Sequence, residues 1–457
     1  MTDKTSVSLV ILPTTIIRRT NIMMRSLYSG VAGLKAHQTK MDVIGNNIAN
    51  VNTIGYKSQN VTFSDVLYQT TQSASGPNTE TGAGGTNAKQ IGLGSTVSAI
   101  STKVAEAGGS QATNNPFDIM INGDSMFIVN NNGVNYFTKA GNFSVDTNGT
   151  LVTSQGYAVM GWDADEEGTI MKTNVSQICL YSAENKYAAP VATTETNVTG
   201  NINKEDESFS SVSGTISTNI TFYDSLGYKY QVTLDISQTS DYEYDLSVSS
   251  VSCDGDKLPL EPSDLEGLLD NDAVLKFSDA TGAIAEGGMV SLKVSSLGIA
   301  SLAQDINIDF TKMTCMGTDT TLLPARGDLE GMDAGRTVGN LSGVSIQKDG
   351  KIVASYDNGD QRVIAQIAVA NFTNLSGLEK VGDNLFSATL NSGEFDGIGD
   401  DITADGGYFS TGVVEMSNVD LAAEFTDMIT TQRGYQANSR IITVSDTLLE
   451  ELINLKR

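Results

Sequence analysis

The chain has 457 residues, more than one ordinary hydrophobic core holds, so two or three domains are expected. Its formal net charge of -26 repels phosphate groups, which argues against binding to nucleic acid or to an anionic membrane surface. The three cysteines are far apart and lack a CxxC spacing, which excludes a zinc ribbon and favours buried free thiols over a disulfide framework.

The first 22 residues hold a short apolar stretch, residues 7–12, without the basic start and small-residue cleavage site of a signal peptide. No apolar run approaches the roughly 20 residues that cross a bilayer, so no membrane insertion is expected. We interpret residues 1–22 as a poorly structured, non-native extension from an upstream start codon. The working protein would then begin at Met23 or Met24.

Apolar residues with helical spacing follow this segment. They recur every seven residues with an adjacent stripe beside them, at Leu27, Val31, Leu34, Met41, Ile44 and Ile48. Such a repeat is typical of a coiled-coil-like seam. The asparagine-rich stretch 46–52 and Gly55 predict the end of this helix. The only histidine, His37, lies beside the stripe and is interpreted as a surface or packing residue rather than a general base.

The middle of the chain is predicted to form almost entirely strands and turns. Alternating apolar residues between Asn-Gly turns predict strands at 119–124, 126–129, 135–138, 142–145 and 150–153, a hairpin at 221–234, and further strands within 344–371. The stretch 70–90 is too polar and glycine-rich to pack, which predicts a flexible or wrapped connector. Two polar, turn-rich stretches, 195–210 and 322–336, bracket an inserted acidic β-domain.

No constellation of catalytic residues is visible. The chain has no GxSxG, GxGxxG or GxxxxGK[ST] motif, and one histidine cannot build a histidine-rich metal cluster, so we predict no enzyme and no cofactor. Residues 163–170 resemble the first eight positions of a calcium loop, but position twelve is Asn174 and no helices flank it. A solvated β-turn is the favoured interpretation.

A second helix is predicted at the far end. Its seven-residue repeat consists of Leu421, Met428, Tyr435, Ile442 and Leu449, joined by Phe425. Ser417 with Asp420 three residues later has the pattern of a capping box. A helix over about 420–455 would be about 50 Å long at about 1.5 Å per residue. The two end helices can bury their stripes against each other in one monomer, between subunits of a polymer, or both.

The resulting fold class is multidomain α+β, with paired terminal coiled-coil-like helices and two mainly antiparallel β-domains nested between them. The expected division is an extension at 1–22 and a helical core at 23–56 with 415–457. A connector follows at 57–110 and 401–414, then a first β-domain at 111–195 with 336–400. The inserted outer β-domain covers 196–335.

Both ends also carry a family resemblance. Residues 26–34 and 41–57, together with 415–421 and 428–438, resemble the terminal signatures of the bacterial flagellar axial proteins, the family of rod, hook and related subunits. The matching signature positions are Asn46, Asn47, Ala49, Asn50, Gly55, Tyr56, Lys57, Asn418, Asp420, Gln432, Arg433, Tyr435 and Asn438. Residues 115–162, 221–227 and 365–386 look like the β-domains of hook subunits in particular.

The resemblance implies a structural subunit of the flagellar hook, which assembles with itself into a flexible tube that transmits motor torque to the filament. Implied partners are the rod, the hook cap, the hook-filament junction proteins and the type III export apparatus. The implied location is the extracellular hook and basal body, reached without a cleavable signal peptide. A rod protein and a secreted β-rich adhesin are the alternatives.

Overall fold

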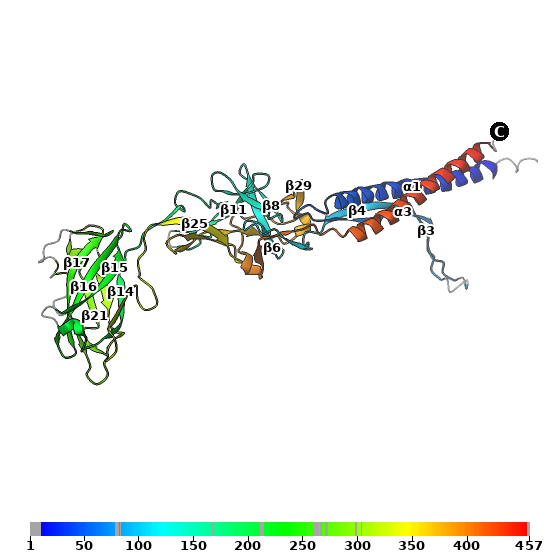
Figure 1. The fold of residues 1–457 in the computed structure, drawn as a ribbon. Helices are drawn as coiled ribbons and strands as arrows, with labels where there is room; N and C mark the ends of the chain where they lie inside the picture. The colour runs from blue at the N-terminus through cyan, green and yellow to red at the C-terminus, as the bar shows by residue number, and fades with distance from the viewer. Residues whose placement is uncertain are drawn as a thin grey trace, which may run out of the picture. The chain divides into compact units, whose positions relative to one another are not determined.

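The fold is mostly β-structure, with one long helix near each end (Figure 1). It is a computed structural model that describes residues 11–77, 82, 84–165, 168–210, 214–258, 265, 267–269, 273–297, 299–302 and 304–454. The chain divides into two compact units. Unit 1 comprises residues 1–180, 346–352 and 363–457, and unit 2 comprises 181–345 and 353–362.

The two helices are α1, Ile11–Ala49, and α3, Leu421–Asn454. Helix α1 already includes residues 11–22, so the expectation that this segment is poorly structured is wrong there, while residues 1–10 lie outside the described residues. Helix α3 is capped by Asp420, whose carboxylate accepts hydrogen bonds from the backbone N–H groups of Ala422 (2.8 Å) and Ala423 (3.2 Å). The predicted cap at Ser417 is therefore wrong, because Asp420 directly precedes the first turn.

Helices α1 and α3 lie side by side in unit 1 and run antiparallel (Figure 1). Gly30 of α1 faces Ile442, whereas Lys40, ten residues further on, forms an ion pair of 3.0 Å with Asp427. The close approach uses small residues, because a Cβ atom on Gly33 would stand 2.6 Å from the Asn438 amide nitrogen. The two ends of the chain thus meet along their helices.

A long β-hairpin follows α1, and Figure 1 shows its strand β4 beside the helices. The strands are β1, Gln59–Asp65, paired with β4, Ser95–Thr102, and β2, Tyr68–Gln72, paired with β3, Lys89–Gly92. A bridge between Ser75 and Thr86 extends the second pair. The stretch 70–90, predicted as a flexible or wrapped connector, is not flexible over its described residues, since cross-strand backbone hydrogen bonds order it; 78–81 and 83 lie outside them.

The sheet of unit 1 holds the hydrophobic core of that unit. Pairing runs β9-β10-β11-β7-β8-β30-β29, with β28 added to β7, and β12 and β27 added to β11. Phe127, Phe137 and Trp162 are among its fully buried side chains. Separate ribbons pair β6 with β31 and β5 with β32. The bounds are β5 Ser110–Ala112, β6 Ile119–Asn122, β7 Met126–Asn131, β8 Val134–Thr138, β9 Phe143–Val145, β10 Leu151–Thr153, β11 Ala158–Asp163, β12 Ser176–Gln177, β27 Gln361–Ile367, β28 Val369–Ala370, η3 Leu375–Gly377, β29 Glu379–Gly382, β30 Leu385–Ser387, η4 Ile402–Asp405, β31 Tyr408–Thr411 and β32 Val413–Glu415.

Unit 2 packs an antiparallel sheet, β15-β16-β17-β19-β20 with β18 on β17, against a second sheet, β21-β22-β14-β23 with β24 on β14. Strand β14 runs parallel to β22 and β23, so the prediction of antiparallel pairing is wrong for these two pairs, whereas β14 with β24 and β21 with β22 are antiparallel as predicted. The bounds are β13 Tyr187–Ala188, β14 Glu195–Ile202, η1 Glu207–Ser210, β15 Thr215–Tyr223, β16 Lys229–Ser240, β17 Glu243–Cys253, β18 Asp256–Lys257, β19 Val274–Phe277, β20 Ile284–Glu286, β21 Met289–Leu292, η2 Val294–Leu297, β22 Ile306–Asp309, β23 Met313–Cys315, β24 Thr321–Arg326, β25 Gly339–Ile346 and, leading back to unit 1, β26 Lys351–Tyr356.

The three cysteines form no disulfide bond, but only Cys315 is buried, whereas Cys179 and Cys253 are partly exposed, so the expected burial is wrong for these two. In the part of the chain that the structure describes, no helix is both long and apolar enough to cross a membrane. The finer division into helical core, connector and two β-domains stays a prediction.

Candidate functional site

The contact between α1 and α3 is narrow and unusually rich in small and polar residues. On α1 the buried positions lie three residues apart, except for one gap of eight between Ala36 and Ile44, and comprise Gly30, Gly33, Ala36, Ile44 and Asn47. On α3 the buried positions are Thr431 and Ser445, with Gly434 and Asn438 between them half-buried. Such residues let two backbones approach closely but cover little apolar surface.

Much of the apolar surface of the helix pair is therefore uncovered. Large apolar side chains are exposed on both helices, at Tyr28, Val31, Leu421, Phe425, Ile429, Tyr435, Ile441, Val444, Leu448 and Ile453. We call these ten residues the open apolar face. So many exposed large apolar side chains on one helix pair are typical of a surface that another protein covers.

The predicted seam residues divide between the buried contact and this open face. Ile44 is buried, and Leu27, Leu34, Met41, Ile48, Met428, Ile442 and Leu449 are half-buried. Val31, Leu421, Phe425 and Tyr435 are exposed and belong to the open face. Their role in assembly stays a prediction.

Five of the thirteen signature residues meet at the end of α1, where the helix joins the hairpin, in an arrangement that we call the signature junction; they are Asn47, Gly55, Tyr56, Lys57 and Asn418. Its centre is the buried side chain of Asn47, which donates to the Gln59 carbonyl and to a carboxylate oxygen of Glu424, both at 2.8 Å. The amide oxygen of Asn47 accepts from the Gln59 N–H (3.0 Å) and the Tyr56 hydroxyl (3.2 Å). One side chain thus ties α1, β1 and α3 together.

A buried ion pair forms the second part of the junction. The Lys57 ammonium donates to Glu415 at 2.8 Å and to the Glu106 carbonyl at 2.7 Å, and both paired side chains are only 1% exposed. The same Glu415 oxygen accepts the Gly108 N–H at 2.9 Å, while the other has no hydrogen-bond partner among the described residues. Such a pair is sensitive to the loss of either partner, which would leave an uncompensated buried charge.

Gly55 and Asn418 complete the junction. Gly55 has a φ of 68°, donates to the Glu415 carbonyl at 2.8 Å, and lies so close to Ala140 that a Cβ atom would stand 2.6 Å from its nitrogen. A glycine is therefore required there. Asn418 accepts from the Ser58 N–H at 2.7 Å and donates to the Lys103 carbonyl at 3.0 Å.

Two further lysines surround the junction. Lys380 donates to the Lys57 carbonyl at 2.7 Å and lies 4.4 Å from the centroid of the Tyr56 ring, and burial lowers its pKa to about 8. Burial likewise lowers the pKa of Lys139 to about 8, and this lysine donates to the Gly123 carbonyl at 2.6 Å. The junction is thus a dense polar centre that leaves these ammonium groups poorly hydrated.

Not all signature residues lie in the junction. Asn46 and Asn50 lie beside it. The Asn46 amide donates to the Tyr56 hydroxyl, and the Asn50 amide donates to the Asn46 carbonyl. Ala49, Gln432 and Arg433 are exposed. Glu415 was missed as a candidate because its partner Lys57 lies 358 positions away, although its place as the first residue of the signature segment 415–421 was a signal.

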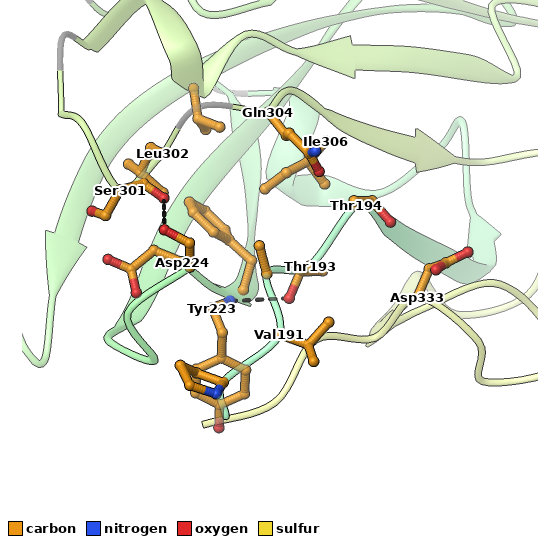
Figure 2. Close-up of a pocket in the computed structure, with 15 residues that line it drawn as sticks. Val191, Thr193, Thr194, Tyr223, Asp224, Ser301, Leu302, Gln304, Ile306 and Asp333 are labelled. Atoms are coloured by element: carbon orange, nitrogen blue, oxygen red, sulfur yellow. Dashed lines mark hydrogen bonds between the residues drawn. The ribbon is translucent and has the colours of Figure 1, made fainter. Parts of the chain in front are cut away.

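Unit 2 contains a cleft of about 400 Å³ (Figure 2), lined mainly by residues 190–194, 222–225, 301, 302, 304 and 306. In it, the Tyr223 N–H donates to the Thr193 hydroxyl at 3.0 Å, and the Ser225 hydroxyl donates to the Ser301 carbonyl at 3.1 Å. These hydrogen bonds link neighbouring segments of the cleft lining, and they do not pair a nucleophile with a base. Across the described residues, no group of three or more His, Cys, Asp or Glu could hold a metal ion.

Residues 163–170, which resemble a calcium loop, form a turn. The Thr169 N–H donates to the Asp165 carboxylate at 2.7 Å, and the Ser176 hydroxyl donates to the Asp163 carboxylate at 2.7 Å. Residues 166 and 167 lie outside the described residues.

Two long terminal helices with an open apolar face, tied to β-structure by a buried polar junction, are typical of a subunit that associates with copies of itself. Four family models match the chain. They are Flagella basal body rod protein over residues 27–57, Flagellar hook protein FlgE/F/G D1 domain over 120–203, Flagellar basal body protein FlaE D2 domain over 192–328, and Flagellar basal body rod FlgEFG protein C-terminal over 410–455.

Full-length relatives agree with these models. Flagellar hook protein FlgE of Borreliella burgdorferi is 36% identical over 95% of this chain and 100% of its own length. Flagellar hook protein FlgE of Treponema pallidum is 32% identical over the same shares. Flagellar basal-body rod protein FlgG of Bacillus subtilis is 29% identical, again over 95% and 100%. The chain belongs to the flagellar hook protein family.

Proposed function

We propose that the chain is a structural subunit of the bacterial flagellar hook and that many copies assemble into a tube through α1 and α3. The observation that carries the proposal is the open apolar face, defined above. Covering an apolar side chain of this size contributes about 1.5–3 kcal/mol, so a neighbour that covers several of them can be held firmly. The net charge of -26 repels copies at long range, which leaves short-range packing as the source of association.

The signature junction would give the tube its mechanical continuity. Asn47 and the Lys57–Glu415 pair fix α1 and α3 to the β-strands of unit 1, so that a torque applied to the helices would also turn these strands. The serine-, threonine- and asparagine-rich β-surfaces suit contacts that slide and form again as the tube bends, because wet polar interfaces exchange readily. Together these features support a flexible joint between motor and filament.

The names of the relatives support the rest of the proposal. They are hook and rod proteins, which favours a structural role, a place in the hook or basal body, and partners among the other flagellar components. A rod protein is the second candidate, since the Bacillus subtilis relative is one. The higher identity to hook proteins and the match of residues 192–328 to the FlaE D2 domain favour the hook. An export route without a cleavable signal stays part of the proposal.

The proposal is tested by placing a charge on the open apolar face. Phe425 and Ile429 are exposed, so Phe425→Asp and Ile429→Asp leave the monomer folded but should prevent tube formation, because burying a carboxylate against apolar neighbours is costly. Tubes are counted by negative-stain electron microscopy of the purified full-length chain.

Ser249→Asp is the matched control, since it adds the same charge at an exposed position of β17 in unit 2 and should permit normal tubes. Circular dichroism checks that every variant is folded. Normal tubes from Phe425→Asp and Ile429→Asp would contradict the proposal.

A further inference from the structure

The only histidine of the chain lies in the contact between the two terminal helices. His37 of α1 packs directly on the backbone of Gly434 in α3, where an added Cβ atom would stand 2.7 Å from both Cε1 and Nε2 of the imidazole. The other side of the ring meets the edge of Phe63 in β1, with ring centroids 5.8 Å apart at 67°. The imidazole therefore fills the space between three elements.

This environment suits a neutral imidazole. Its Nδ1 atom is buried and has no hydrogen-bond partner among the described residues. Burial, and to a smaller extent the positive charge of Lys40, lower the pKa of His37 below its ordinary value of 6.5. A proton added to the ring would bring a second positive charge beside Lys40, at a place that offers Nδ1 no acceptor.

The charged groups on the surrounding elements are already engaged. Asp427 of α3 pairs with Lys40 at 3.0 Å, and Arg433 of α3, itself positive, donates to Gln436. Asp65, the one charged residue of β1, shares a hydrogen bond with Tyr68. Strand β4, which also packs on α1, contains no charged residue. The carboxylates of Asp427 and Asp65 are thus bound to other groups rather than to the imidazole.

We propose that His37 makes the contact between α1 and α3, and with it the assembly of copies of this chain, sensitive to pH. The neutral ring holds the helices together, and protonation loosens them. This inference rests on the proposed function, because it names a regulation of the same helix pair.

The direction of the effect follows from the lowered pKa. A group whose folded pKa lies below its unfolded pKa of 6.5 contributes its full stability above 6.5, and this contribution is lost as the pH falls through and below that value. Each unit of difference between the two pKa values lowers the equilibrium constant for forming the contact between α1 and α3 about tenfold once the pH lies below both. Assembly is therefore expected at neutral and alkaline pH and should weaken as the pH falls below 6.5, above the range in which most carboxylates titrate.

The first test measures the pKa of His37 directly. Because the chain has one histidine, tubes labelled with ¹⁵N-histidine give the solid-state NMR signals of one imidazole ring. The inference predicts a midpoint below 6.5, and a midpoint at or above 6.5 overturns it. Should no tubes form at any pH, the proposed function fails instead, and the same titration is made on the soluble full-length chain.

The second test compares the sedimented fraction of three full-length chains from pH 8 to pH 5.5. His37→Gln, which cannot take up a proton in this range, should change less than about twofold, whereas the wild type loses assembly several-fold. Gln38→His is the matched control, because Gln38 is exposed on the next position of α1 and a histidine there should leave the wild-type profile unchanged. An equal loss in His37→Gln and in the wild type overturns the inference while leaving the proposed function intact.

Discussion

At the scale of single residues, the junction depends on side chains that satisfy several backbone groups at once. Asn47 makes four hydrogen bonds from one buried amide, to Gln59 twice, to Tyr56 and to Glu424. A buried amide with every bond formed stabilises one geometry and penalises others, because each lost bond leaves an unsatisfied polar group. The three segments that it joins are therefore held in a fixed arrangement.

The buried ion pair predicts a large effect of a single substitution. Lys57→Met should destabilise unit 1 by about 3–5 kcal/mol, since it leaves Glu415 charged and buried without its partner. Lys351→Met is the control, because Lys351 pairs with Asp349 at 3.1 Å but its side chain is 41% exposed, and its loss should cost about 0–1 kcal/mol. Urea unfolding followed by the fluorescence of Trp162, the only tryptophan and a core residue of unit 1, measures both. Equal effects of the two substitutions would disprove the special role of Lys57.

At the scale of elements, the helix ends show how local chemistry decides a boundary that periodicity leaves open. The seven-residue repeats correctly predicted helices near both ends, because a buried stripe must follow the helical period. They did not decide between Ser417 and Asp420 as the cap, since both residue types favour that position. The repeats also did not reveal which residues form the contact between the two helices, because Gly30 and Gly33 of α1 and Thr431 of α3 are buried there rather than large apolar residues.

The cap of α3 gives a prediction at this scale. Asp420→Ala should destabilise the first turn by about 1 kcal/mol, because the N–H groups of Ala422 and Ala423 lose their acceptor. Hydrogen exchange of these two amides should become about fivefold faster. Asp420→Asn retains a good capping side chain and should change exchange little, and Ser417→Ala should have no effect there. A larger effect from Ser417→Ala than from Asp420→Ala would restore the capping box that the sequence suggested.

The strands, like the helix ends, were predicted only in part. Those of unit 1 with alternating apolar residues, such as β7 and β8, lie where the pattern predicts them. The pairing of β2 with β3 could not be predicted, because its residues are exposed and its order comes from backbone hydrogen bonds rather than from a buried face. The parallel pairing of β14 with β22 and β23 was equally hidden, since these strands are far apart in the sequence.

At the scale of the whole molecule, the two ends of one chain form a helix pair that is well joined to β-structure and poorly covered on its outer side. The sequence predicted the helices and the family, yet the division of the stripes into a narrow internal contact and an open apolar face required the structure. Residues on the open face include Phe425, Ile429 and Leu448, which α1 leaves exposed. A polymer in which each copy covers this face of the next accounts for the arrangement.

Electron cryomicroscopy of tubes assembled from the full-length chain tests this central claim most directly. The expected result is that α1 and α3 of neighbouring copies pack together as the innermost wall, with Phe425, Ile429 and Leu448 buried between copies. Tubes in which these side chains remain exposed, or in which the terminal helices are not ordered, would contradict the account.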